Sequence, residues 1–87
     1  MSVAQKIGNG HAYSKHGTEF GVSDSDQLSF IVENIMKNPS EIRNLSRGRT
    51  AYWDVESGAV VITDPNQIDG GTIFKPAHGK LYFDNMR

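Results

Sequence analysis

Apolar residues recur with helical spacing in the first half of this chain and alternate as in strands in the second half. The clearest helical pattern repeats at positions i, i+3, i+4, i+7 and i+8, which are Leu28, Ile31, Val32, Ile35 and Met36. Ser23, Asp24 and Ser25 precede this pattern, and residues of these types cap helix N-termini. The pattern predicts a helix that ends near Asn38 and packs its apolar face on a sheet.

The segments on either side of this helix also carry helical signals. Before it, residues 4–16 predict a short helix, and Gly17 suits the left-handed position that follows many helix C-termini. After it, Pro39 can begin another helix, because helices tolerate proline at their first position. Residues 39–45 are therefore predicted to form a third helix that buries Ile42 and Leu45.

Four strands are predicted in the second half, at residues 50–55, 59–63, 72–75 and 80–83. Short turns rich in glycine, proline and aspartate separate them. Helices followed by strands indicate an α+β fold. We expect a single domain over residues 1–87, with N-terminal helices packed on a four-stranded antiparallel β-meander.

Composition narrows the classes of function. A chain of 87 residues supports one small core. It has no cysteine, which excludes a thiol nucleophile, a disulfide scaffold and a cysteine-based zinc site. No apolar run is long enough for a membrane span, and the first residues lack the apolar centre of a signal peptide. Net charge of −1 argues against a general polyanion binder, although a few clustered cations can still form a site.

The first helix carries candidate catalytic residues. His11 and Lys15 are i, i+4 neighbours and share a face, and His16 lies next in the chain. Histidine is the usual general acid or base near neutral pH, and lysine can stabilise a developing phosphate charge. The alternative interpretation is a solvated helix face.

Three arginines, Arg43, Arg47 and Arg49, lie within seven positions before the predicted sheet. The planar guanidinium matches phosphate with two hydrogen bonds, so these residues are candidates for substrate binding or, for Arg49, catalysis. Cations near a helix end that complement its dipole are the alternative.

A third candidate site is the segment Asp69-Gly70-Gly71-Thr72. Gly70 and Gly71 can let backbone amides approach a ligand, Thr72 adds a hydroxyl, and Lys75 adds a cation for substrate binding. A turn that needs positive φ is the alternative. No metal-ligand spacing is present in the sequence, so we expect no metal and no cofactor. Histidines, cations and a hydroxyl without a metal suit cleavage of RNA by its own 2′-OH.

Several segments resemble known toxins. Residues 15–22, Lys-His-Gly-Thr-Glu-Phe-Gly-Val, resemble the Lys-His…Phe-Gly-Val segment of the tRNA-cleaving bacteriocins of the colicin D type. More broadly, residues 11–16, 48–53 and 69–74 are similar to C-terminal toxin domains of contact-dependent growth inhibition and filamentous-haemagglutinin proteins. The resemblance covers about residues 8 to 85 and implies the fold shared by barnase, EndoU, colicins and RelE.

The resemblance also implies a function. It implies metal-independent cleavage of tRNA in the cytoplasm of a target bacterium, after delivery as part of a larger secreted or cell-surface protein. It implies a cognate immunity protein and, as in some relatives, a translation elongation factor of the target cell. Lys15 and His16 match the catalytic pair of the bacteriocin. Thr72 falls near the hydroxyl residue of that family but not on it, and the family's tryptophan there has no counterpart.

A second class of function stays open. The chain could be a non-enzymatic protein-binding module, such as an immunity or adaptor protein, whose arginines and aromatic strands contact a partner. The coexistence of His11, Lys15, His16 and Arg49 with the Gly-Gly-Thr loop favours the nuclease. A DNase is disfavoured because the sequence has no His-Asn-His metal-binding arrangement.

Overall fold

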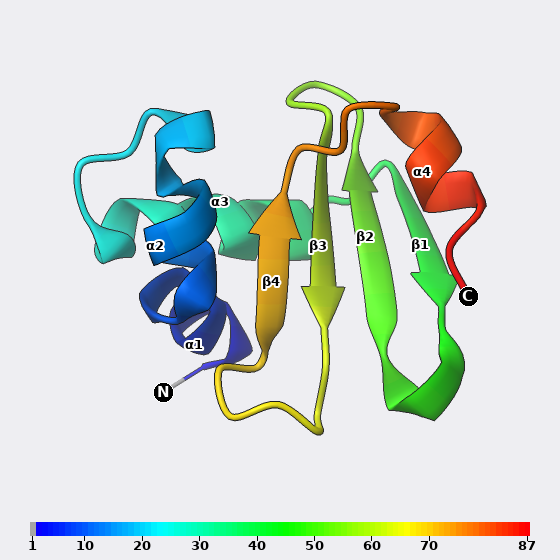
Figure 1. The fold of residues 1–87 in the computed structure, drawn as a ribbon, viewed down its shortest axis with the longest axis horizontal. Coiled ribbons are helices and arrows are strands. Elements are labelled where there is room, and N and C mark those ends of the chain that lie inside the picture. The colour runs from blue at the N-terminus through cyan, green and yellow to red at the C-terminus, as the bar shows by residue number, and fades with distance from the viewer. Residues whose placement is uncertain (1) are drawn as a thin grey trace.

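Four antiparallel strands form the centre of the structure, a computed structural model that describes residues 2–87 (Figure 1). The helices and strands follow in the order α1 (Val3–Asn9), α2 (His11–His16), α3 (Ser25–Lys37), β1 (Glu41–Asn44), β2 (Thr50–Asp54), β3 (Ala59–Thr63), β4 (Gly71–Phe74) and α4 (Lys80–Asp84). Short 3₁₀ helices lie at Gly17–Phe20 and Ser46–Gly48. The predicted α+β class, with helices on a four-stranded antiparallel meander, is confirmed.

The strands pair in the order β1-β2-β3-β4, so each strand neighbours the next one in the chain. In one cross-strand row Ala51 of β2 faces Ile62 of β3, which in turn faces Thr72 of β4. Because side chains alternate along a strand, this row and the row of Trp53, Val60 and Phe74 lie on the same face. We call this face the front face and the opposite one the back face.

Helix α3 covers the back face, as its apolar pattern predicts. Asp24 caps the helix by accepting a hydrogen bond from the Gln27 amide at 2.9 Å. Buried side chains of α3 pack with α1, α2 and the back of the sheet, and they are Leu28, Val32 and Ile35. Ile31 and Met36 lie at the margin of this core and are half-buried.

A smaller core lies on the front face beneath α4. Phe83 is buried against Trp53, with ring centroids 6.2 Å apart, and Leu45, Ala51 and Val60 complete the cluster. Helix α4 lies over the β1–β2 side of this face, with Tyr82 reaching Phe74 of β4, and α2 lies beside β4 (Figure 1). The candidate site lies on the same face, where His11, Ile62 and Thr72 line one hollow.

The predicted third helix is wrong, because residues 41–44 form strand β1 instead. The amide of Ser40 donates a hydrogen bond to the Trp53 carbonyl at 2.8 Å and begins the pairing with β2. Ile42, expected in the core, is 55% exposed, whereas Leu45 is buried as expected. Pairing along a whole neighbouring strand outweighs the local capping signals.

The predicted strand at residues 80–83 is also wrong, because this segment is helix α4. Gly79, at φ 56°, turns the chain before the helix begins. A helix of this length places Phe83 into the front core while Leu81 and Tyr82 stay exposed. The sheet keeps four strands because β1 takes the place of the expected last strand.

The N-terminal helix is interrupted at Gly10, which separates α1 from α2. Gly17 is right-handed at φ −54°, contrary to prediction, and the left-handed residue is Gly21 at φ 65°. Among residues 2–87 no helix combines the length and apolar character needed to cross a membrane.

Candidate active site

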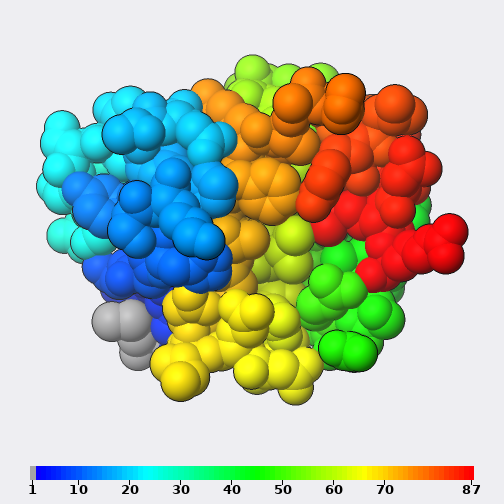
Figure 2. All heavy atoms as spheres, in the orientation of Figure 1, coloured from blue at the N-terminus to red at the C-terminus, as the bar shows by residue number. Residues whose placement is uncertain are grey.

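A hollow of about 160 Å³ opens on the front face between α2 and the β3–β4 loop. Residues from five segments of the chain line it, namely His11, Arg49, Ile62, Asp64, Gln67, Gly71 and Thr72. Figure 2 shows this side of the molecule, with the blue atoms of α2 and the red atoms of α4 on either side of orange β4. The hollow therefore unites His11, Arg49 and Thr72, three of the predicted catalytic residues.

His11 is held in place by Asp69, which lies at the end of the β3–β4 loop. The Nδ1 atom of His11 hydrogen-bonds to Oδ2 of Asp69, and the His11 amide lies 3.4 Å from the same oxygen. The imidazole hydrogen bond, together with backbone amides of His11 and Gly71, lowers the pKa of Asp69 below its usual value despite partial burial. Because Nδ1 is occupied, Nε2 is the ring nitrogen available to a substrate.

Gly10 makes this contact possible. A Cβ atom at Gly10 would lie 2.5 Å from the Cβ of Asp69 and 3.0 Å from the Lys6 carbonyl oxygen. Only glycine lets the start of α2 approach the loop this closely. The break between α1 and α2 thus places His11 beside its carboxylate partner.

Thr72 supplies the hydroxyl at the floor of the hollow. Its Oγ1 atom is buried and has no hydrogen-bond partner within residues 2–87. Gly71 before it adopts φ 135°, and a Cβ there would lie 1.9 Å from the Ile62 carbonyl oxygen. The buried, unpaired hydroxyl has an unused capacity to donate a hydrogen bond.

Arg49 forms one wall, and other groups of the protein hold it there. Its Nε atom donates to the Ser46 carbonyl at 3.1 Å, and its Nη2 atom donates to the Arg87 carbonyl at 2.7 Å. None of these acceptors is the side-chain carboxylate of an aspartate or glutamate. Arg49 can therefore still stabilise an anionic phosphate.

Arg47 stands at a second hollow that adjoins the first. This hollow of about 560 Å³ is polar, and its lining consists of Ser46, Arg47, Arg49, Asp64, Asn66 and Gln67. Arg47 has φ 63°, the one positive φ outside glycine in residues 2–87, and its carbonyl accepts from Asn66 Nδ2 at 3.1 Å. Left-handed backbone at a non-glycine residue costs about 1–2 kcal/mol, and such strain concentrates at functional sites.

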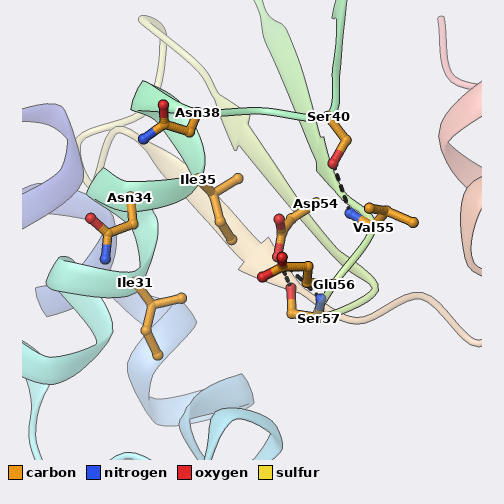
Figure 3. A pocket seen from close by; sticks show the side chains of 9 residues that line it. All are labelled: Ile31, Asn34, Ile35, Asn38, Ser40, Asp54, Val55, Glu56 and Ser57. Atoms are coloured by element: carbon orange, nitrogen blue, oxygen red, sulfur yellow. Dashed lines mark hydrogen bonds between the residues drawn. The ribbon is translucent and has the colours of Figure 1, made fainter.

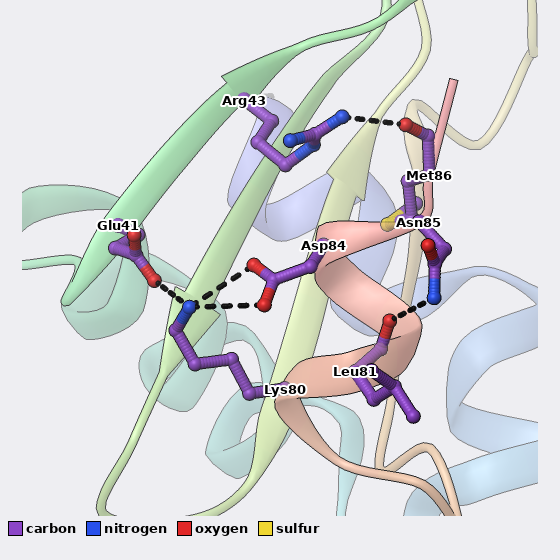
Figure 4. Close-up of polar contacts among 7 residues, drawn as sticks. All are labelled: Glu41, Arg43, Lys80, Leu81, Asp84, Asn85 and Met86. Carbon is purple, nitrogen blue, oxygen red and sulfur yellow. Dashed lines mark hydrogen bonds and ion pairs between the residues drawn. The ribbon is translucent and has the colours of Figure 1, made fainter.

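Arg43 does not line either hollow. It lies in the same cross-strand row as Thr72 but on β1, three strands away. Its Nη2 atom donates to the Met86 carbonyl at 2.8 Å (Figure 4). Its guanidinium carbon lies 6.0 Å from the Phe83 ring centroid. These contacts hold the C-terminal segment against the sheet, so Arg43 has a structural role.

His16 lies at the other end of α2, beside Phe74. The ring centroids of His16 and Phe74 are 5.9 Å apart, and Nδ1 of His16 pairs with Oε2 of Glu19. Partial burial alone would raise the pKa of Glu19. The hydrogen bonds from His16 and the Lys75 amide outweigh this effect, so the pKa of Glu19 lies below its usual value. As at His11, a carboxylate occupies Nδ1 and leaves Nε2 available.

Lys15 is exposed one helical turn after His11. Of the residues predicted to bind substrate, Gly71 lines the hollow that contains His11, whereas Gly70 and Lys75 do not. Lys75 is exposed, with its ammonium nitrogen 5.0 Å from the Phe20 ring centroid. Gly70 is buried at φ 77° against Lys6, so its glycine is explained by the turn that presents Asp69.

Four polar residues at the site were not predicted from the sequence, namely Glu19, Asp64, Gln67 and Asp69. Asp69 looked like a turn residue, because nothing in the local pattern signals a partner 58 positions away. Glu19 has a local signal, since a carboxylate three residues after a histidine can reach it on a helical turn.

A separate hollow of about 400 Å³ lies between α3 and the β2–β3 turn (Figure 3). Its polar groups partly satisfy one another, since Ser57 donates to Asp54 at 2.6 Å and the Val55 amide donates to the Ser40 hydroxyl at 3.0 Å. It contains neither histidine nor arginine. The acid–base candidates therefore belong to the front face.

Within residues 2–87, no group of three or more histidine, aspartate or glutamate side chains is placed to hold a metal ion. The hollow offers the His11 imidazole with its carboxylate partner, the guanidinium of Arg49 and the unpaired hydroxyl of Thr72. A second imidazole with a carboxylate partner, that of His16, lies outside this lining at the other end of α2. Such groups can transfer protons and stabilise a negatively charged phosphorane. No protein-family model matches this chain, and no curated protein sequence matches it significantly.

Proposed function

We propose that this protein is an endoribonuclease that cleaves tRNA without a metal ion and acts as an antibacterial toxin. The observation that carries the proposal is the hollow that brings His11, Arg49 and Thr72 together, with Asp69 orienting His11. Tertiary structure assembles these residues from three distant parts of the chain. The resemblance to bacterial toxin domains contributes tRNA as the substrate class.

The proposed reaction uses the 2′-OH of the substrate as nucleophile. The 2′-oxygen attacks phosphorus while its proton passes to the Nε2 atom of one histidine. The bond from phosphorus to the 5′-oxygen breaks, and the second histidine protonates that oxygen. The products are a 2′,3′-cyclic phosphate and a 5′-OH end. His11 and His16 fill the two roles, and general acid–base groups of this kind contribute about 10²–10⁴-fold in rate.

Charge stabilisation comes from the groups around the phosphate. Arg49 and Thr72 line the hollow with His11, and exposed Lys15 lies one turn further along α2. Arg47 in the adjoining polar hollow would bind a neighbouring phosphate of the RNA. Each hydrogen-bond donor aimed at a developing oxyanion is worth on the order of 10²–10³-fold in rate.

The biological setting follows the same resemblance. The domain would be delivered to a target cell as part of a larger surface or secreted protein. A cognate immunity protein would block the cationic site in the producing cell, and electrostatic steering would speed its binding. A translation elongation factor of the target cell is a further candidate partner.

The decisive experiment has two stages. Induced expression in bacteria should stop growth and shorten tRNA, as seen on a denaturing gel of total RNA. The purified protein should then cleave tRNA in EDTA, leave a 2′,3′-cyclic phosphate, and fail on a substrate with a 2′-deoxy scissile nucleotide. Growth arrest with intact tRNA would contradict tRNA cleavage, and a 5′-phosphate product would contradict the mechanism. Absence of any RNA cleavage would favour the protein-binding alternative.

A further inference from the structure

We propose that a hollow along α4 binds a nucleobase of the RNA, next to the phosphate that reacts. This inference rests on the proposed ribonuclease function and names a feature of its substrate, an unpaired nucleotide. The hollow measures about 370 Å³ and is lined by His78, Leu81, Tyr82, Asn85 and Met86. Its volume lies in the range of about 300–1,000 Å³ that small-molecule sites occupy.

An aromatic contact connects this hollow to the candidate active site. Tyr82 is 44% exposed, and its ring meets the ring of Phe74 edge to face at a centroid distance of 5.5 Å. Phe74 lies two residues after Thr72 on the same strand and therefore points to the same face. Thr72 and Phe74 are thus separated by about 7 Å along β4. A nucleotide spans a similar distance between its phosphate and its base.

The lining of the hollow suits a base better than a phosphate. None of its five residues is acidic, lysine or arginine, and Leu81, Tyr82 and Met86 offer apolar surface. Bases have apolar faces and polar edges, and they stack readily on aromatic side chains. The hollow also has two groups that can read an edge, the His78 ring and the Asn85 side chain.

The side chain of Asn85 is held in place by a hydrogen bond. Its Nδ2 atom donates to the Leu81 carbonyl at 2.9 Å (Figure 4), which fixes the amide and leaves Oδ1 free to accept a hydrogen bond. Two charges that adjoin the lining residues in the chain are engaged elsewhere, since Lys80 pairs with Glu41 at 2.8 Å and with Asp84 at 3.0 Å. The hollow is therefore apolar with a fixed acceptor at its margin.

The binding test uses an inactive variant, His11→Ala, so that RNA survives the measurement. A fluorescently labelled single-stranded oligoribonucleotide is compared with the same strand carrying abasic nucleotides, by fluorescence anisotropy. In this background Tyr82→Ala should weaken binding of the intact strand by about fivefold to a hundredfold, the effect of losing one stacked base. Tyr82→Phe should keep the affinity, and the abasic strand should bind all variants weakly.

Phe30→Ala provides a matched control, because Phe30 is also an exposed aromatic residue, 64% exposed, but lies on α3. It should leave RNA affinity unchanged. Trp53, the only tryptophan, packs on Phe83 of α4, so its fluorescence reports whether each variant keeps the helix folded. Equal affinity of Tyr82→Ala and Tyr82→Phe would overturn the proposal, as would undiminished binding of the abasic strand.

A second measurement needs no substitution. The unmodified protein is titrated with the four nucleoside monophosphates and followed by NMR. Shifts at the Asn85 side-chain amide and the Tyr82 ring would support the base site, whereas shifts confined to α3 or the β2–β3 turn would overturn it. Neither outcome depends on RNA cleavage. The ribonuclease function is tested separately, by cleavage of tRNA with the unmodified protein.

Discussion

Asp69 contacts both the Nδ1 atom and the backbone amide of His11, although 58 positions separate the two residues. The carboxylate thus fixes the orientation of the ring and the start of α2 with one oxygen. A base whose ring is fixed in this way needs no rearrangement before proton transfer. The pairing is the main reason to place His11 at the centre of the proposed site.

Replacing Asp69 by asparagine should therefore lower kcat for RNA cleavage on the order of 10²-fold with little change in KM, because the variant keeps RNA-binding residues but loses control of the ring. Steady-state kinetics on a short RNA substrate measure both constants. Asp26→Asn, at an exposed aspartate in the first turn of α3, is the matched control and should behave as the unmodified protein. Equal kcat for Asp69→Asn would remove Asp69 from the mechanism.

The same carboxylate should make stability depend on pH. Its pKa in the folded chain lies below the ordinary value of 3.8, so its ionised form favours the folded state at higher pH. This contribution is present above the unfolded pKa and is lost as the pH falls through the folded one. The difference in free energy of unfolding between the unmodified protein and Asp69→Asn should shrink from about pH 6 to about pH 3. Urea unfolding at several pH values measures it, and a constant difference would contradict the assignment.

Thr72→Val should separate stability from activity. Valine keeps the shape of threonine and removes a buried hydroxyl that has no partner, so the free energy of unfolding should stay equal or rise by up to about 1 kcal/mol. Cleavage should fall on the order of 10²-fold, because a donor to the phosphate is lost. Thr72→Ser should keep the cleavage rate. A Thr72→Val protein with full activity would show that the hydroxyl has no role in the reaction.

His16→Ala should lower the rate of cleavage by about 10²–10⁴-fold if His16 is the second acid–base group. Circular dichroism should show a folded protein, because His16 packs at the margin of the core beside Phe74. Lys37→Ala, at an exposed residue in the last turn of α3, is the control for the loss of a side chain near a helix C-terminus. A fully active His16→Ala protein would leave His11 as the sole histidine of the site.

Arg47→Gly should weaken RNA binding without a large loss of stability. Glycine adopts the left-handed backbone of this position without strain, and this gain offsets its larger entropy in the unfolded chain, so stability should stay within about 1 kcal/mol. Loss of one phosphate contact should reduce the slope of log affinity against log salt concentration by about 0.7–0.9. Arg47→Lys, which keeps the charge, should retain the slope. An unchanged slope in Arg47→Gly would remove Arg47 from the RNA interface.

Periodicity predicted the elements whose apolar faces are buried by neighbours. Helix α3 and strand β3 are correct because nearly all of their apolar side chains lie in a core. The pattern failed at the two edges of the fold. Ile42 is apolar but exposed on an edge strand, and the Leu-Tyr-Phe run of residues 81–83 buries only Phe83. At such places long-range pairing or a single anchor residue decides the structure, and local propensity does not.

The candidate site was predictable only in its residue types. His11, Arg49 and Thr72 were identified because their side chains suit phosphate chemistry, and the fold places them around one hollow. Arg43 has the same chemistry but lies three strands away from Thr72, beside the C-terminal segment. The sequence alone does not show how far Arg43 lies from Thr72 in the fold. Asp69 and Tyr82 could be found only once the β3–β4 loop and α4 had been placed in space.

The meander has a consequence for the order of folding. Each strand pairs with its neighbour in sequence, so the sheet closes through short loops, whereas docking α2 on β4 closes a loop of 58 positions between His11 and Asp69. Loop-closure entropy increases with loop length, and contacts distant in sequence form slowly. We therefore expect RNA cleavage to appear last in a refolding reaction, after Trp53 fluorescence has already recovered. A nascent chain would remain harmless to the tRNA of the cell that makes it until α2 has docked beside β4.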